Sequence, residues 1–250
     1  MKPRTTRAKP AFISRAPQNG TDYRIYVDAP DPANGRTPMP LVLVMDGDYL
    51  FDAAVEASRA LAAAGKIEPT AVVGVGYGAG FGDPGNHRGR DYTPTASTDE
   101  PSSGGAESFH AYLMDSLWPE LAGRLPLDPG KRVIAGHSLG SLLVLHALFQ
   151  ERPFFTRALA SAPSIWWDNR SILGIVSRLR DRQDALDGRL YLGVGADDTP
   201  SMTGDLALLE KQLRERPFRG LSVVAQSFAG QDHYNVAPYT LSAGIASMIG

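Results

Sequence analysis

Short apolar runs alternate along the chain with longer segments rich in residues that favour helices. Residues 41–45, Leu-Val-Leu-Val-Met, form one such run, which is typical of a strand buried on both faces of a parallel sheet. The alanine-rich segment 51–64 follows and stops before Gly65, as a helix does. The same reasoning predicts further buried strands at 70–75, 132–135, 158–160, 189–194 and 221–225, and further helices at 109–125, 139–150, 172–182, 206–216 and 239–249.

Two segments depart from this alternation. Residues 22–27 alternate polar and apolar side chains, which predicts a half-buried strand at one edge of the sheet. Residues 76–105 are rich in Gly, Pro, Ser, Thr and Asp, and a loop of this length is usually functional or mobile; whether it acts as a lid is left open. Together the elements predict an α/β fold with a mainly parallel sheet, helices on both faces, and ligands at the carboxyl ends of the strands.

The composition is that of an ordinary folded globular protein: of the 250 residues, 43% are apolar and 21% are charged. We expect a flexible or edge-strand leader at 1–20 and one α/β domain at 21–250. The formal net charge of −2 supplies no field that would attract nucleic acid, so no such partner is expected. Cysteine is absent, which excludes disulfides, thiolate nucleophiles and cysteine-ligated zinc.

The N-terminal segment is basic, but it lacks the apolar run of a secretion signal. No later segment approaches the roughly 18 unbroken apolar residues of a membrane span. Pro3, Pro10 and Pro17 interrupt the amphipathic helix that an organelle transit peptide would need. We therefore expect a cytoplasmic protein with no membrane partner, and the oligomeric state stays open.

The stretch 133–141, Val-Ile-Ala-Gly-His-Ser-Leu-Gly-Ser, leads from a predicted strand directly into a predicted helix. It contains the G-x-S-x-G pattern, in which a serine occupies a sharp turn and presents its hydroxyl above the sheet. Gly136 and Gly140 leave room for this strained turn, and the amide of Leu139 can donate a hydrogen bond to a developing oxyanion. The alternative is a Gly-Ser turn without chemistry, but the flanking strand and helix favour Ser138 as a nucleophile.

A serine hydroxyl needs a base, and the base must itself be oriented by a third group. His233 is the preferred base because it follows the last predicted strand and precedes the closing helix. The other histidines precede the serine, adjoin it on the turn, or lie within a predicted buried helix: His87, His110, His137 and His146.

The acid is expected after an intermediate strand, and the strand that starts at Arg189 ends in Val-Gly-Ala-Asp-Asp at 194–198. Asp198 is preferred because the first residues after the strand make the turn and the next one reaches the histidine. Asp197 remains an alternative. Placing Asp198 between the serine and His233 reproduces the chain order that a nucleophile elbow on this kind of sheet requires.

The turn after the strand at 41–45 reads Met-Asp-Gly-Asp at 45–48. Gly47 lets the backbone approach a substrate closely, so the amide of Asp48 is expected to be the second oxyanion donor. Two acids there could also indicate a metal site, but no histidine accompanies them, and no metal is expected. Residues 74–79 fit a dinucleotide-binding fingerprint, but no helix can follow them, so no cofactor is expected.

Four stretches carry narrower signals: Val44-Met-Asp-Gly-Asp-Tyr-Leu-Phe51, Arg90-Asp-Tyr-Thr-Pro94, Ala160-Ser-Ala-Pro-Ser-Ile-Trp-Trp167 and Gly230-Gln-Asp-His233. Together they resemble the putative-esterase family of α/β-hydrolases, which includes the trilactone siderophore esterases acting on enterobactin, salmochelin and bacillibactin. The resemblance implies an α/β-hydrolase fold and a serine carboxylesterase that needs no cofactor. It also implies that Ser138 is the nucleophile, His233 the base and Asp198 the acid.

We interpret three further side chains as lining a substrate pocket. Arg88 and Arg90 can meet an anionic or catechol-bearing substrate, and Trp166 can form an aromatic wall beside the serine. Asp91 and Trp167 are interpreted as structural. The expected function is hydrolysis of a small-molecule ester through an acyl-enzyme, with a siderophore-type trilactone among the candidate substrates. The alternatives are acyl transfer, thioesterase or peptidase chemistry with the same triad, or a ligand-binding homologue without catalysis.

Overall fold

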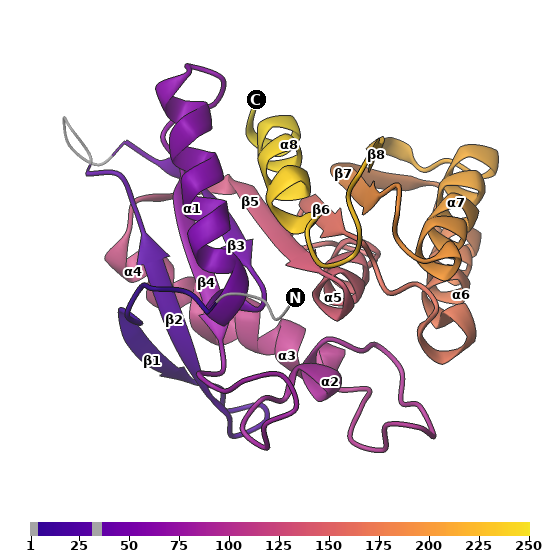
Figure 1. The fold of residues 1–250 in the computed structure, drawn as a ribbon, viewed down its shortest axis with the longest axis horizontal. Coiled ribbons are helices and arrows are strands. Elements are labelled where there is room, and N and C mark those ends of the chain that lie inside the picture. The colour runs from indigo at the N-terminus through magenta and orange to yellow at the C-terminus, as the bar shows by residue number, and fades with distance from the viewer. Residues whose placement is uncertain (1–4, 32–36) are drawn as a thin grey trace.

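The computed structural model describes residues 5–31 and 37–250, and in this part of the chain the sheet has eight strands, most of them parallel. The strands lie in the order β1-β2-β4-β3-β5-β6-β7-β8 (Figure 1). β1 and β2 are antiparallel to their neighbours, and all other neighbouring pairs are parallel, which confirms the predicted α/β fold. The strands are β1 Phe12–Arg15, β2 Asp22–Asp28, β3 Met39–Val44, β4 Ala71–Gly76, β5 Leu127–His137, β6 Arg157–Ser161, β7 Ala185–Gly195 and β8 Arg219–Phe228.

Helices cover both faces of the sheet. α1 and α8 pack against one face, and α5 packs against the other, where α3, α6 and α7 also lie (Figure 1). All the residues of β3 and β4 are buried, because successive side chains point to opposite faces and both faces are covered. The helices are α1 Gly47–Ala63, α2 Arg88–Asp91, α3 Ala106–Tyr112, a π-helical turn η1 Leu113–Leu117, α4 Trp118–Arg124, α5 Leu139–Leu148, α6 Trp167–Arg182, α7 Pro200–Glu215 and α8 Ala237–Ile249.

The structure corrects two predicted elements. The helix predicted at 109–125 is divided by the π-helical turn η1, directly before the proline at position 119. Proline has no N–H and cannot continue the regular hydrogen-bond ladder, so the backbone widens before it. The strand at 22–27 does not lie at the sheet edge, because β1 pairs along its outer side. The part of the predicted leader at 12–15 is therefore the edge strand, whereas residues 1–4 lie outside the described part of the chain.

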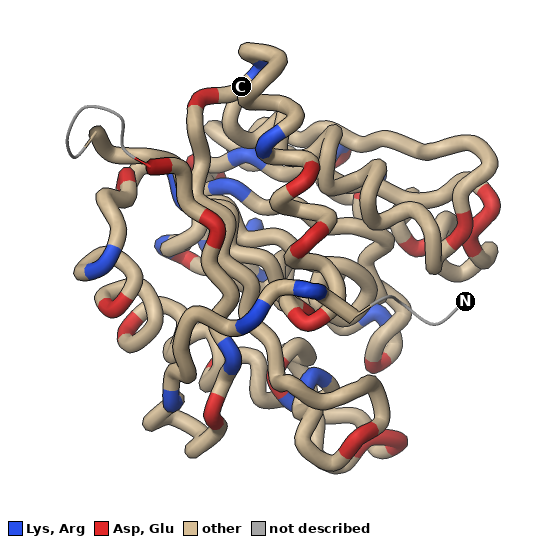
Figure 2. Tube along the Cα trace, turned by 60° about the vertical axis from the view of Figure 1, so that its left-hand side comes forward, with Lys and Arg blue, Asp and Glu red and all other residues tan. Residues whose placement is uncertain are grey.

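Three loops follow the carboxyl ends of parallel strands and therefore lie at the same end of the sheet. β5 leads into α5, β7 into α7, and β8 into α8, and a functional side chain predicted from the sequence follows each of these strands. Lys and Arg are interspersed with Asp and Glu along the chain in Figure 2, as the small net charge suggests. Within residues 5–31 and 37–250, no helix combines the length and apolar character that crossing a membrane would require.

Candidate active site

Ser138 is the single residue between β5 and α5, and its backbone conformation is strained. Its φ of 58° and ψ of −122° lie in a region that side-chain-bearing residues rarely adopt, at a cost on the order of 1–3 kcal/mol. A Cβ on Gly136 would come within 2.4 Å of the backbone carbon and oxygen of Gly140. Glycine at 136 is therefore required for the strand and the helix to meet at so sharp an angle.

Hydrogen bonds hold the turn in this shape. The amide of Ser138 donates to the carbonyl of Ser161 over 2.9 Å, which ties the elbow to the neighbouring strand β6. The buried hydroxyl of Ser141 lies 2.7 Å from the carbonyl oxygens of both Gly136 and Ser161. The hydroxyl of Ser141 can thus donate to a backbone carbonyl at the turn, and a larger side chain would have no such role at this buried position.

The structure brings Ser138, Asp198 and His233 together. His233 Nε2 lies 3.1 Å from Ser138 Oγ, and His233 Nδ1 lies 3.0 Å from Asp198 Oδ2. The side chain of Asp198 is completely buried, whereas Asp197 is exposed. A second contact holds the acid, because its Oδ1 accepts a 2.7 Å hydrogen bond from the amide of Thr199. Of the two candidate acids, only Asp198 faces the histidine.

This arrangement places each imidazole nitrogen of His233 against a different partner. With the proton on Nδ1 donated to the carboxylate of Asp198, the lone pair of Nε2 is free to accept the hydroxyl proton of Ser138. A buried carboxylate also stabilises the imidazolium that forms when the proton moves. The geometry can therefore activate a serine nucleophile.

A second histidine lies against the first. The rings of His137 and His233 are 4.7 Å apart between centroids, and His137 Nδ1 lies 3.0 Å from the hydroxyl of Ser161. Burial, with smaller effects from the nearby His233 and Arg88, lowers the pKa of His137 to about 3. His137 is therefore neutral near pH 7, and its Nδ1 contacts Ser161 instead of the nucleophile.

The turn between β3 and α1 lies beside the elbow. A Cβ on Gly140 would stand 3.4 Å from Met45 Cβ and 3.5 Å from Asp46 Oδ2. Asp48 is the second residue of α1, so its amide is among those with no acceptor inside the helix. Its buried carboxylate accepts hydrogen bonds from the hydroxyl of Tyr26 and from the amides of Tyr77 and Gly78.

Asp46 and Arg88 form a buried pair next to this turn. The guanidinium of Arg88 bonds both carboxylate oxygens of Asp46, at 3.1 Å and 2.9 Å. Asp46 has a left-handed φ of 52°, and its amide donates to the hydroxyl of Tyr92. The acid-rich turn was visible in the sequence, but its neighbours in the chain do not indicate that Asp46 binds Arg88. Its partner Arg88 is thus held near the elbow, as a pocket residue would be.

The two acids of this turn face different partners. The carboxylate of Asp46 is bound by Arg88, whereas that of Asp48 is bound by Tyr26 and by backbone amides. Among the residues that the structure describes, no group of three or more potential ligands is arranged to hold a metal ion.

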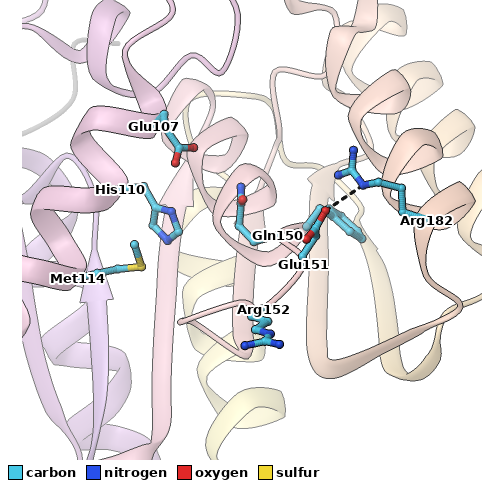
Figure 3. Close-up of a pocket in the computed structure, with 8 residues that line it drawn as sticks. Glu107, His110, Met114, Gln150, Glu151, Arg152 and Arg182 are labelled. Carbon is cyan, nitrogen blue, oxygen red and sulfur yellow. Dashed lines mark ion pairs between the residues drawn. The ribbon is translucent and has the colours of Figure 1, made fainter.

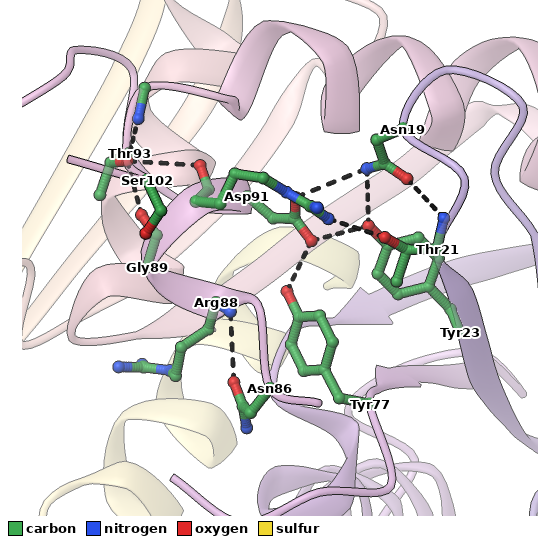
Figure 4. Close-up of polar contacts among 12 residues, drawn as sticks. Asn19, Thr21, Tyr23, Tyr77, Asn86, Arg88, Gly89, Asp91, Thr93 and Ser102 are labelled. Carbon is green, nitrogen blue, oxygen red and sulfur yellow. Dashed lines mark hydrogen bonds and ion pairs between the residues drawn. The ribbon is translucent and has the colours of Figure 1, made fainter. Parts of the chain in front are cut away.

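Arg90 contacts a structural cluster and not the triad (Figure 4). Its Nε donates to Asp91 over 2.7 Å and its Nη2 to Thr21 over 2.8 Å. The fully buried carboxylate of Asp91 also accepts from the hydroxyls of Tyr23 and Tyr77. Burial, together with Asp91, raises the pKa of Tyr23. These contacts agree with the structural interpretation of Asp91, and they hold the guanidinium of Arg90 beside its carboxylate.

The two tryptophans of the Trp-Trp pair have different environments. Trp166 is 46% exposed, whereas Trp167 is buried and donates its indole N–H to the carbonyl of Thr95. Two places before Trp166, the hydroxyl of Ser164 lies 3.2 Å from Ser138 Oγ. Trp166 is thus the member of the pair that can reach a ligand beside the serine.

Two more exposed aromatic side chains adjoin residues of the site. Tyr234 follows His233 directly and is 73% exposed, and the guanidinium of Arg88 lies 4.7 Å from the ring centre of Phe81, itself 46% exposed. Neither ring is recognisable as a site residue from the sequence, because the exposure of an aromatic ring is not indicated by its neighbours in the chain.

A separate open pocket of about 410 Å³ lies at the other end of α5 (Figure 3). α5 has ten residues, so its two ends are roughly 15 Å apart. Burial lowers the pKa of His110, which lines this pocket, to about 4. No triad residue lines it; its walls are Glu107, His110, Met114, Phe149, Gln150, Glu151, Arg152 and Arg182.

A serine on a sharp strand-to-helix turn, facing an acid-bound histidine at the carboxyl edge of a mainly parallel sheet, defines the class of α/β-hydrolases. The chain belongs to the putative esterase family, whose model matches residues 16–237. The resemblance seen in the sequence is thereby confirmed.

Named relatives and solved structures agree with this family. The siderophore triacetylfusarinine C esterase of Aspergillus fumigatus is 35% identical over 161 residues, which cover 62% of this chain and 55% of the relative. The ferri-bacillibactin esterase BesA of Bacillus subtilis is 28% identical over 250 residues, covering 92% of this chain and 86% of the relative. The BES protein from Bacillus cereus has a similar structure, with a TM-score of 0.84 and 28% identity over 100% of this chain and 97% of that one. This chain thus spans little more than half of the fungal relative but most of the bacterial ones.

Proposed function

We propose that the protein is a serine esterase in which Ser138 is the nucleophile, His233 the general base and Asp198 the acid that orients it. The observation that carries the proposal is the pair of contacts at the two nitrogens of His233, 3.1 Å to the hydroxyl and 3.0 Å to the carboxylate. Asp198 is buried whereas Asp197 is exposed, which supports the assignment of Asp198 as the acid.

In the first half of the reaction, Ser138 Oγ attacks the ester carbonyl carbon while its proton passes to His233 Nε2. The carbonyl oxygen becomes an oxyanion, which the amides of Leu139 and Asp48 stabilise, each lying at the start of a helix. His233 then donates the proton to the leaving alkoxide. The products are an alcohol and an acyl group covalently bound to Ser138.

In the second half, water attacks the acyl carbon and gives a proton to His233 Nε2. The second tetrahedral intermediate collapses, Ser138 leaves as the alkoxide, and it recovers its proton from the histidine. A free carboxylic acid is released and the resting arrangement returns. Every step uses groups of the chain and one water molecule.

A siderophore-type trilactone is the substrate that we propose. Relatives named for triacetylfusarinine C and ferri-bacillibactin support this choice. The exposed rings of Trp166, Tyr234 and Phe81 near the site provide apolar and π surfaces that aromatic acyl groups can contact, and the guanidinium of Arg88 can meet an anionic one.

The test replaces Ser138 with Ala and uses a fluorophosphonate probe and a panel of esters. The wild type should be labelled once, at Ser138, and should hydrolyse p-nitrophenyl butyrate and ferric or iron-free catecholate trilactones. Ser138→Ala should do neither while keeping the far-UV and near-UV spectra of the wild type. Labelling elsewhere, or undiminished turnover in Ser138→Ala, would refute the proposal.

A further inference from the structure

The last strand of the sheet is exposed along nearly its whole length in the isolated chain. Within residues 5–31 and 37–250, β8 pairs only with β7, and no strand lies along its outer edge. Val223 and Val224 point to opposite faces and are 38% and 43% exposed, whereas all the residues of β3 are buried. Leu221 and Phe228 pack partly against the core, but among the described residues neither helix layer covers the centre of this strand.

The outer edge of β8 lacks the features that usually protect an edge strand. Residues 220–228, Gly-Leu-Ser-Val-Val-Ala-Gln-Ser-Phe, contain no proline and no charged side chain. Natural sheets protect such edges with lysine, proline, bulges or short strands, because free backbone N–H and C=O groups otherwise pair with another strand. The first residue, Arg219, is charged, but its guanidinium bonds both oxygens of Asp184 in the same chain.

We propose that β8 pairs antiparallel with β8 of a second copy of this chain, so that one sheet continues through both copies. A two-fold axis perpendicular to the sheet keeps each side chain on its own face and places one residue of β8 opposite itself. Centring the axis on Val223 places Leu221 opposite Ala225 of the second copy, with all three apolar side chains on one face.

Charge favours a second copy as the partner. In this register Arg219 lies opposite the neutral Ser227, and the two copies of Arg219 stand eight residues apart along the pair, roughly 26 Å. Charges at that distance are screened by physiological salt. A strand as neutral as β8 is the matching partner for β8, whereas a charged strand would bury unpaired charge beside Val223 and Val224.

The size of the contact also suits a stable dimer. A ten-residue strand paired with its own copy forms on the order of ten backbone hydrogen bonds, about the number in a typical protein interface. Isologous two-fold dimers are also the commonest assembly of identical chains. The central valines precede the end of β8, and the loop carrying His233 comes after it, so pairing leaves the triad intact.

The absence of cysteine in the chain allows a clean test by crosslinking. Val223→Cys and Val224→Cys should each be made, because the residue on the axis faces itself across the pair. One of them should form a disulfide-linked dimer under mild oxidation with retained ester hydrolysis. Ile13→Cys, on the opposite edge strand β1 and 55% exposed, is the matched control and should stay monomeric on the denaturing gel.

Sedimentation velocity of the unmodified chain supplies the second measurement. The wild type should sediment as a dimer, and Val223→Lys should raise the dissociation constant at least tenfold without loss of thermal stability or of esterase activity. Leu208→Lys, which changes an exposed apolar residue on α7, should leave the dimer unchanged. A monomeric wild type, a dimer indifferent to Val223→Lys, or equal crosslinking at Ile13→Cys would overturn the proposal.

Discussion

Asp198 and His233 are joined by a 3.0 Å hydrogen bond although 35 residues separate them in the chain. The carboxylate is fully buried, and its other oxygen accepts a hydrogen bond from the amide of Thr199. Both oxygens are therefore fixed in position, and the hydrogen bond to one of them fixes the orientation of the imidazole. The adjacent Asp197 shares the sequence context of Asp198 but is exposed.

The two aspartates should therefore differ sharply when replaced. Asp198→Asn should lower kcat/KM for p-nitrophenyl butyrate by about 10²- to 10⁴-fold, because an amide stabilises neither the required tautomer nor the imidazolium. Asp197→Asn should change it less than twofold. Steady-state kinetics decides, and equal losses in the two variants would contradict the assignment.

Gly136 should not tolerate even a methyl group. In Gly136→Ala the new Cβ would lie 2.4 Å from backbone atoms of Gly140, so the elbow must open and Ser138 must move. We expect loss of activity and a decrease in the free energy of unfolding of about 1–3 kcal/mol or more. Gly123→Ala, where a Cβ meets nothing within 4 Å, is the control and should be neutral in chemical denaturation. A fully active Gly136→Ala would show that the turn is more open than described.

Removing only one partner of the Arg88–Asp46 pair should strongly decrease the free energy of unfolding. Arg88→Met leaves the carboxylate of Asp46, which is 4% exposed, without its cation, and about 3–5 kcal/mol should be lost in urea denaturation. Adding Asp46→Asn should restore part of the loss, because no unpaired charge then remains. The control is Arg15→Met, which breaks an exposed pair and should cost less than about 1 kcal/mol. Additive losses in the double variant would rule out coupling.

His110 should make the fold sensitive to acid. Burial, together with the nearby His146, lowers its pKa to about 4 in the folded chain, below the ordinary value of 6.5. Between these values the unfolded chain binds the proton and the folded chain does not, so stability is full above about pH 6.5 and falls as the pH decreases toward 4. This residue alone should account for about 2 kcal/mol between pH 7 and pH 5.

His110→Gln keeps a polar side chain but removes the titration. Urea unfolding at pH 7 and pH 5 should therefore show a smaller loss of stability in the variant than in the wild type. An identical loss in both proteins would mean that other groups cause the acid sensitivity, with the buried His137 the next to examine.

Trp166 should distinguish aromatic substrates from small ones. Trp166→Ala should lower kcat/KM for a catecholate trilactone about tenfold, the effect of losing roughly 1.4 kcal/mol of ring contact, and should leave p-nitrophenyl acetate almost unaffected. Trp118→Ala, which removes a ring packed against Phe154 and Arg132, serves as the control for general damage. Equal losses of kcat/KM on both substrates would show that Trp166 stabilises the fold and does not contact the acyl group.

Much of the fold was predictable because it depends on patterns within a few residues of each other. The unbroken apolar run at 41–45 indicated a strand covered on both faces, and β3 is buried at every position. The glycines around Ser138 indicated the elbow, which β5 and α5 form at the predicted place. Prediction failed locally where one residue changed the backbone, as at the π-helical turn before the proline at 119.

The sequence by itself determined the alternation of elements, the elbow and the chain order of Ser138, Asp198 and His233. The tertiary structure alone decided which aspartate is buried, that Arg90 binds Asp91, and that Val223 and Val224 of β8 are exposed. The physical reason is the range of the interactions. The shape of a turn is set by steric contacts between neighbours in the chain. The partner of a side chain tens of residues away depends on how all the strands and helices pack, which no local sequence pattern indicates.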